Sequence, residues 1–344
     1  MQEVTLIRRV MRNKAAPLLI ILVVLVIVTM ILSSGVLDGE SASAMLNEGF
    51  MSRGNLINIF YSLVIQCVMM CGISIILIGG NIDLSVSGQA ALGSMLFAFI
   101  CRDFPQLPWG VALIAALILG AIFGLCNTFL VGKLNFPPFI ATIGMASIYR
   151  GMCNVITNGN NININRASLN NLMQLKLFDR FPATFLFAIV LLIIYSFILS
   201  QTTFGRSIYM TGGNRQAARL SGINTGRIRL ILFVNNGVLA VLGGVLWSSQ
   251  SKLASPTAIL GFEPGMSAIA ASILGGVSFM GGAGTLGGPL IALMLLSVFN
   301  NMLRVVGLDD YWTVFAQGLL LVVALVIDFI SEERRRRALL QAKQ

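Results

Sequence analysis

Long apolar runs separated by short polar segments dominate this chain of 344 residues. A helix that crosses a bilayer needs about 20 predominantly apolar residues, and a window of about 19 residues locates such runs. Several runs are short or contain glycine, which fits helices that break inside the membrane. The pattern predicts an all-α polytopic membrane protein with about ten transmembrane helices, over Pro17–Leu32, Leu56–Gly79, Leu84–Ile100, Val111–Val131, Phe139–Val155, Ala183–Ser200, Leu230–Ser249, Gly265–Met280, Leu286–Leu303 and Trp312–Ile330.

A polar segment, Gln201–Arg229, interrupts this pattern between the sixth and seventh runs. It contains no acidic residue, and its arginines are Arg206, Arg215, Arg219, Arg227 and Arg229. It is shorter than the roughly 40 residues below which chains rarely fold alone. We therefore expect this segment to lie at the membrane surface and to be held by a partner protein.

The basic residues predict the topology, because lysine and arginine next to membrane spans stay in the cytoplasm. With both termini cytoplasmic, an even number of spans puts most of them on that side: Arg8, Arg9, Arg12, Lys14, Lys133, the arginines of 201–229, Arg334–Arg337 and Lys343. The loops on the opposite side are then Ser33–Asn55, Cys101–Gly110, Ile156–Pro182, Gln250–Pro264 and Arg304–Tyr311. This divides the chain into a cytoplasmic segment 1–16, a membrane domain 17–330 with a cytoplasmic loop 201–229, and a basic cytoplasmic tail 331–344.

The N-terminus also fits a second interpretation. A basic start, an apolar run and the triplet Ala42-Ser43-Ala44 are typical of a cleaved secretory signal. The triplet lies well beyond the end of the apolar run, however, and cleavage would upset the even number of spans. We expect an uncleaved first span.

Composition agrees with a membrane protein, since 56% of residues are hydrophobic and only 10% are charged, against roughly 25% charged in soluble domains. The formal net charge is +10. Because the basic residues border apolar runs, the charge indicates topology and contact with membrane lipid, and we expect no nucleic-acid partner.

The sequence lacks the usual means of catalysis. It has no histidine, no GxxxxGK[ST] phosphate-binding motif and no GxSxG motif, and its five cysteines have no metal-ligand spacing. We expect a non-catalytic protein with no cofactor and no metal site.

Polar residues inside the apolar runs are candidates for a solute path. Asp83 lies in GGNIDLS (79–85), and a carboxylate at bilayer depth costs about 2.5–3.5 kcal/mol on insertion scales. Asp83 or Ser85 is alternatively a helix cap that accepts from the first amides of the next helix. Both interpretations stay open.

Amides are the second polar group within the spans. They are Gln66, Asn127, Asn235, Asn236, Asn300 and Asn301, with Trp247, Gln250 and Glu263 near the outer edge. Amides suit a polyhydroxylated solute, although hydrogen bonding between helices is an equally good explanation for any one of them. As candidate solute-path residues we take Asn81, Asp83, Asn127, Asn235 and Asn300.

Glycine is concentrated at 275–288, too densely for an ordinary span. The pairs Gly79-Gly80 and Gly275-Gly276 occupy similar places in the two halves of the chain, which hints at an internal repeat. Spacings such as Gly120/Gly124 and Gly284/Gly288 predict closely packed helices.

Four motifs in order give a resemblance to a known family. GNIDLSVSG (80–88), PPFIATIG (137–144), TFGRSIYMTGGN with AARLSGI (203–223) and the glycine run at 275–288 resemble the ribose-type sugar permeases of bacterial ABC importers. The resemblance extends from about residue 55 to 330. Two features depart from the family pattern: Ser87 precedes Gly88, and the segment Ser33–Asn55 is longer than usual.

The resemblance implies a permease in the bacterial inner membrane that pairs into a homodimer or heterodimer. It also implies two cytoplasmic ATPase subunits and a periplasmic sugar-binding protein as partners. The short helix within Asn214–Ile223 would be the coupling helix that enters a groove on the ATPase. The residues implied in coupling are Gly205, Arg206, Gly212, Gly213, Asn214, Ala217, Ala218, Arg219, Ser221 and Gly222.

The function expected from this resemblance is import of a monosaccharide or sugar-like solute by alternating access, driven by separate ATPase subunits. Which sugar is carried stays open. The alternative from another class is an ion-coupled secondary transporter that works without an ATPase and uses Asp83 or Glu263 as its coupling carboxylate.

Overall fold

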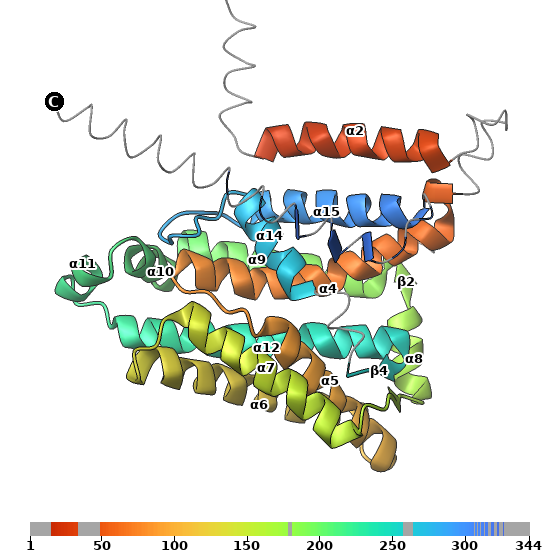
Figure 1. The fold of residues 1–344 in the computed structure, drawn as a ribbon, viewed down its shortest axis with the longest axis horizontal. Helices are drawn as coiled ribbons and strands as arrows, with labels where there is room; N and C mark the ends of the chain where they lie inside the picture. Colours follow the sequence, from red (N-terminus) through yellow and green to blue (C-terminus); the bar gives the residue numbers. More distant parts are fainter. Residues whose placement is uncertain are drawn as a thin grey trace, which may run out of the picture.

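A computed structural model of the chain describes residues 15–33, 49–177, 181–256 and 264–305, together with scattered positions between 307 and 326. It is built almost entirely of helices (Figure 1). In order the elements are α2 (Ala15–Ser33), η2 (Gly49–Met51), α4 (Arg53–Ile78), α5 (Val86–Asp103), α6 (Trp109–Thr128), η3 (Phe129–Lys133), α7 (Pro138–Thr157), β1 (Ile162–Asn163), α8 (Ala167–Gln174), β2 (Lys176–Leu177), β3 (Phe181–Pro182), α9 (Ala183–Gln201), α10 (Thr203–Gly213), α11 (Arg215–Leu220), α12 (Thr225–Ser251), β4 (Leu253–Ala254), α14 (Pro264–Leu274) and α15 (Gly287–Val305).

Within the described residues, six helices are long and apolar enough to cross a membrane. They are α4, α6 with its η3 extension, α7, α9, α12 and α15, and each matches one of the predicted spans. Two shorter apolar stretches, Leu18–Ile31 in α2 and Pro264–Leu274 in α14, add to them. The chain is therefore a mostly helical, multi-pass membrane protein. The predicted last span, Trp312–Ile330, lies largely outside the described residues, as do segments 1–14 and 327–344.

Two elements differ from the expected spans. The run Leu84–Ile100 forms α5, which is rich in small and polar residues and is buried along most of its length. The run Gly265–Met280 forms only the 11-residue helix α14, which ends at Leu274. It ends there because Gly276 has a φ of +91°, and the Val277 amide donates back to the Ser272 carbonyl at 2.9 Å.

The end of α4 has the same geometry as the end of α14. Gly80 has a φ of +71°, and the Asn81 amide donates to the Ile76 carbonyl at 3.0 Å. In both helices the second glycine of the pair, Gly80 or Gly276, adopts the left-handed conformation that residues with side chains disfavour. This equivalence agrees with the internal repeat suggested by the sequence.

The core lies around α4, whose side chains are buried from Leu63 to Ile78. α4 packs against α12, α14, α9 and α15, and α12 in turn packs against α5 and α6. The contact between α6 and α12 is close, because a Cβ at Gly120 would lie 2.6 Å from the Gly237 carbonyl oxygen and one at Gly124 would lie 2.4 Å from the Phe233 oxygen. The predicted close packing at Gly120/Gly124 is thus confirmed.

The outer helices expose large apolar side chains that suit contact with lipid. On α9 these include Leu186, Val190, Ile193 and Phe197, and on α6 Ile114 and Ile118. Several polar groups of the spans, among them Gln66, Asn127 and Asn236, are buried inside, whereas these aliphatic side chains lie outside.

The loops that the structure describes lie at the two ends of the helices (Figure 1). At one end β1 pairs with β4, which joins the loops after α7 and α12. At the same end the Arg166 guanidinium donates to the carbonyl oxygens of Cys101, Phe104 and Pro105 at 2.6–2.9 Å. At the opposite end lie α10 and α11, and there Arg229 donates to the Val131 carbonyl oxygen at 2.7 Å.

Three glycine pairs from distant parts of the sequence meet at that second end. We call Gly79-Gly80, Gly212-Gly213 and Gly281-Gly282 the glycine junction. The Gly282 amide donates to the Ile78 carbonyl at 2.8 Å, and a Cβ at Gly212 would lie 1.9 Å from the same oxygen. Backbones therefore touch without side chains between them, and the end of α10 is fixed to the breaks after α4 and α14.

We predict that Gly212→Ala destabilises the protein by about 3 kcal/mol, the upper end of the overpacking range, because the atoms it meets are backbone. The control is Gly213→Ala at the next position of α10, where the nearest atom to a new Cβ is 3.8 Å away. Helix propensity makes that control neutral or stabilising by up to about 1 kcal/mol. Thermal unfolding in detergent compares the two, and equal transition temperatures would contradict the close approach.

Candidate functional site

Asp83 is fully buried and is enclosed by hydrogen-bond donors. Its Oδ2 accepts from the side-chain amides of Asn236 at 3.0 Å, Asn127 at 3.1 Å and Gln89 at 3.2 Å. Its Oδ1 accepts from the amide of Ser85 at 2.9 Å and from the Ser85 hydroxyl at 2.5 Å. These hydrogen bonds satisfy the acceptor oxygens of a buried carboxyl group, which would be costly to bury without partners.

This network joins three elements. The residues come from the segment between α4 and α5 and from α5 itself, from α6 and from α12. Ser85 also accepts from Gln89 at 2.6 Å and from Asn127 at 2.9 Å, so the amides bridge carboxylate and hydroxyl. The arrangement stabilises the contacts among these helices from inside.

The cap interpretation of this segment holds only in part. Ser85 is the N-cap residue of α5, but its side chain makes no capping hydrogen bond. Asp83 accepts from the amide of Ser85, which precedes the helix, and so closes an Asx turn without reaching the first helical amides. The long-range amides, from Asn127 and Asn236, account for the remaining acceptor capacity of the carboxylate.

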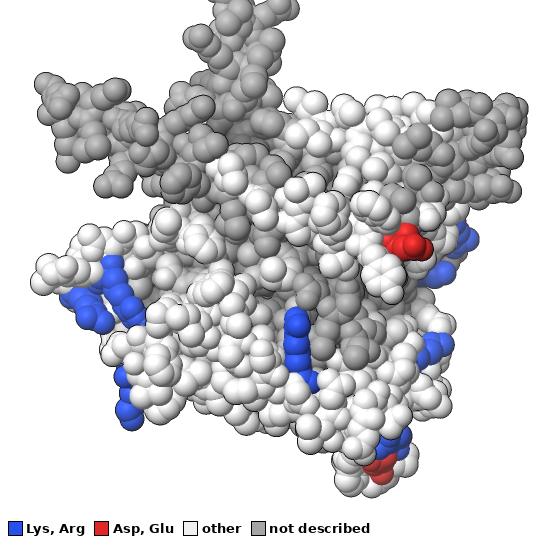
Figure 2. All heavy atoms as spheres, in the orientation of Figure 1, with Lys and Arg blue, Asp and Glu red and all other residues white. Residues whose placement is uncertain are grey.

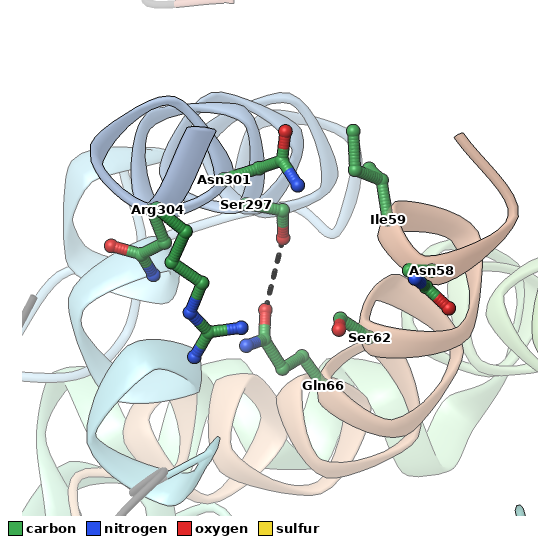
Figure 3. A pocket seen from close by; sticks show the side chains of 8 residues that line it. Asn58, Ile59, Ser62, Gln66, Ser297, Asn301 and Arg304 are labelled. Atoms are coloured by element: carbon green, nitrogen blue, oxygen red, sulfur yellow. Dashed lines mark hydrogen bonds between the residues drawn. The ribbon is translucent and has the colours of Figure 1, made fainter. Parts of the chain in front are cut away.

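A second polar cluster forms a groove between α4 and α15, which we call the polar groove (Figure 3). It encloses a cavity of about 40 Å³. The Ser297 hydroxyl donates to Gln66 Oε1 at 3.1 Å across it, and Asn300 Oδ1 is buried there without a hydrogen-bond partner among the described residues. Its wall is lined by Asn58, Ile59, Ser62, Gln66, Ser297, Asn300, Asn301 and Arg304.

The remaining predicted path residues lie elsewhere. Asn235 is not in the Asp83 network, and its Oδ1 accepts from the hydroxyl of Tyr195. Asn81 lies beside the glycine junction, where its side-chain amide donates to the Gly79 carbonyl at 3.0 Å. The structure thus unites Asp83 with Asn127 but separates both from Asn300, Asn235 and Asn81.

The polar segment 201–229 folds into α10, α11 and the first turn of α12, and α11 protrudes beyond the membrane-spanning helices at the left of Figure 1. Gly205 allows α10 to turn back against the end of α9, since a Cβ there would lie 2.3 Å from the Leu199 oxygen. Gly212 and Gly213 are the last helical residues of α10. The absence of side chains at these two positions allows the backbone contacts of the glycine junction.

The short helix α11 begins and ends as the sequence predicts. The Asn214 side chain accepts from the Ala217 amide at 2.9 Å, and Gly222, with a φ of +81°, follows its end. Ala218 is buried against the hairpin, whereas Ala217 and Ser221 are exposed. Arg219 donates to the Thr225 hydroxyl at 3.0 Å, which ties α11 to α12.

Basic side chains gather at this end of the molecule, as Figure 2 shows near α10 and α11. Arg206, Arg215, Arg219 and Arg227 are all exposed there. Partial desolvation and, to a smaller extent, the like charge of Arg219 lower the pKa of Arg215 from its usual value. The surface therefore favours an acidic or anionic partner.

Some residues of these sites escaped the sequence analysis. Leu220 is 85% exposed at the tip of α11, although leucine is normally buried. Gln89 lies six residues after Asp83 and joins its network. Asn236 and Asn235 look equivalent in the sequence, yet only Asn236 bonds Asp83, because the two side chains point to different sides of α12.

Comparison with known proteins gives one family and a set of relatives. The family model for the permease component of branched-chain amino acid transport systems matches residues 55–325. The chain is 33% identical to the autoinducer 2 import system permease protein LsrC of Salmonella typhimurium over 82% of this chain and 80% of that protein. It is also 33% identical to the ribose import permease protein RbsC of Escherichia coli K12, over 82% of this chain and 88% of that one. No solved structure gives a significant match.

We predict that Asp83→Asn destabilises the protein by about 2 kcal/mol or more, because an amide nitrogen would face donors from Gln89, Asn127 and Asn236. The control is Asp103→Asn, which removes an exposed carboxylate paired only with Arg102. It should change stability by no more than about 0.5 kcal/mol. Thermal unfolding of the purified proteins measures both, and a harmless Asp83→Asn would refute the role given to the network.

Proposed function

Because the chain belongs to the family of permease components of branched-chain amino acid transport systems, we propose that it is the membrane permease subunit of an ABC importer. It would carry a monosaccharide or sugar-like solute inward across the bacterial inner membrane. Its two termini and the loop 201–229 would face the cytoplasm. Separate ATPase subunits would supply the energy, so the chain itself performs no covalent chemistry.

The observation that carries this proposal is the similarity to permeases of import systems over four fifths of the chain. These relatives are named for the import of autoinducer 2 and of ribose. The family description names branched-chain amino acids, whereas both relatives carry other solutes. We favour the sugar-like class, and the hydroxyl and amide groups of the polar groove support it, since they can donate to and accept from hydroxyls.

We place the coupling to the ATPase at α11. The motif residues implied in coupling lie on α10, α11 and the turn after α11, and they share one protruding hairpin. The exposed Leu220 would enter an apolar groove on the ATPase, and the surrounding arginines would pair with acidic side chains at its rim. This arrangement of an apolar centre with a charged edge is typical of protein interfaces.

Force from the ATPase would reach the membrane through the glycine junction. The end of α10 contacts the breaks after α4 and α14 directly through backbone atoms, so a displacement of the hairpin displaces both broken helices. We propose that this linkage drives alternating access. The polar groove would then open in turn to each side, taking solute from a periplasmic binding protein and releasing it inward.

The ion-coupled alternative receives less support. Asp83 is surrounded by donors and occupied in holding three elements together, which suits a structural carboxylate better than one that exchanges ions. Glu263, the other carboxylate considered, lies outside the described residues. Transport that persists in cells without any ATPase partner would favour this alternative.

We predict that Leu220→Asp weakens binding of the cognate ATPase subunit by about tenfold to a hundredfold. Burying one leucine contributes about 1.5–3 kcal/mol, and each 1.4 kcal/mol is tenfold in affinity. The control is Leu175→Asp, which alters a half-exposed leucine beyond α8 at the opposite end. Co-purification with tagged ATPase measures both. Unchanged recovery with Leu220→Asp would count against the coupling site.

We predict that Asn300→Leu lowers uptake of labelled ribose or a related sugar about tenfold in vesicles that hold the assembled importer. The substitution removes the amide group of Asn300, which lines the polar groove and has a buried, unpartnered oxygen. Losing one hydrogen bond to the solute costs about 1 kcal/mol or more. Asn154→Leu is the control, because Asn154 is exposed on α7 and bonds only to its own helix. Equal uptake by the two variants would remove Asn300 from the path.

A further inference from the structure

A cavity of about 150 Å³ lies beside the glycine junction, under the hairpin formed by α10 and α11. Its walls come from three parts of the chain that are distant in sequence. They include Asn81 after α4, Thr211 and Asn214 around the end of α10, Arg215 on α11, Arg229 on α12 and Met280. A cavity of this volume can hold a benzene-sized molecule, so it has room for a small ligand.

Two of the residues that line this cavity each have a buried polar atom with no hydrogen-bond partner among the described residues. The Nε of Arg229 is buried and unpartnered, although Arg229 is only 5% exposed and donates through another nitrogen to Val131. The hydroxyl of Thr211, which is 6% exposed, is also unpartnered. Buried donors of this kind are unfavourable unless something in the cavity accepts from them.

The charge of the cavity specifies the acceptor. Two guanidinium groups, Arg215 and Arg229, line it, and no acidic side chain of the described residues does. Asn81 and Asn214 add amides that can also donate. A buried arginine charge without a carboxylate is costly, and guanidinium groups match the tetrahedral oxygens of phosphate as well as the oxygens of carboxylates.

We propose that this cavity binds a phosphate group, which accepts from Arg229 Nε and from the Thr211 hydroxyl and neutralises the two arginines. The ligand is either free inorganic phosphate or the headgroup of an anionic phospholipid, because both present the same phosphate oxygens. Its binding connects the hairpin to α12 and to the break after α4, and it does not depend on ATPase coupling or on the identity of the transported solute.

The test uses the full chain in detergent and in lipid nanodiscs. Inorganic phosphate is titrated at constant ionic strength against chloride, and thermal unfolding is recorded. In parallel, nanodiscs of phosphatidylcholine alone are compared with nanodiscs that contain phosphatidylglycerol. The variants are Arg229→Gln, which removes the guanidinium charge and the donor to Val131 while keeping one N–H near the position of Nε, and Thr211→Val, which keeps the shape of the side chain. The matched control is Arg227→Gln, which removes an exposed positive charge two residues from Arg229.

The expected result is that the wild type and Arg227→Gln unfold at higher temperature with the phosphate ligand. Arg229→Gln should lose about tenfold or more in affinity, as one charge-assisted hydrogen bond predicts. Thr211→Val should unfold no earlier than the wild type without ligand, because it removes an unpartnered hydroxyl, and yet respond less to phosphate. This second variant keeps the test decisive if Arg229→Gln fails to fold.

The two arms identify the source of the phosphate. Stabilisation by inorganic phosphate assigns the free ion, whereas stabilisation by phosphatidylglycerol alone assigns the lipid headgroup, provided that the variants lose the effect. The proposal is overturned if neither ligand stabilises the wild type. It is also overturned if Thr211→Val and Arg229→Gln respond as strongly as Arg227→Gln.

Discussion

Backbone contact at the glycine junction is the constraint on which the arrangement of this membrane protein depends. Three chain segments, each with a glycine pair, approach so closely that a single methyl group at Gly212 would overlap the Ile78 carbonyl. A side chain between segments allows them to shift by changing rotamer, whereas backbones in contact move together. The hairpin and the two broken helices therefore behave as one body at this end of the molecule.

The Asp83 network makes a complementary connection deeper in the protein. Burying a carboxylate inside a membrane protein normally costs free energy. Here donors from α5, α6 and α12 satisfy the oxygens of Asp83. The glycine junction holds backbones at one end, and the carboxylate holds side chains in the middle. The polar groove between α4 and α15 is separate from both. Its lining residue Asn300 has a side-chain oxygen without a hydrogen-bond partner among the described residues.

The sequence predicted the helices and helix ends, which depend on local pattern. It did not predict which side chains from distant segments bond to one another. The long helices were recognisable because each needs a run of about 20 apolar residues, and α11 was recognisable because Asn214 and Gly222 mark its ends. The early start of α12 at Thr225 was missed, since its first turn is polar. The partners of Asp83 could not be predicted, because Asn235 and Asn236 look alike in sequence while successive helical residues point about 100° apart. The polar groove joins Gln66 to Ser297, and a separation of 231 residues leaves no local signal.

The separation of Asp83 from its last donor has a consequence for biogenesis. Asn236 follows Asp83 by 153 residues, and at a synthesis rate of about 5–20 residues per second it emerges roughly 8–30 s later. During that interval the newly made carboxylate has only the groups within its own stretch of nascent chain, Ser85 and Gln89, and later Asn127. Ser85 and Gln89 are thus the donors that lie close enough in sequence to bond the Asp83 carboxyl group before translation delivers the helix that completes the network.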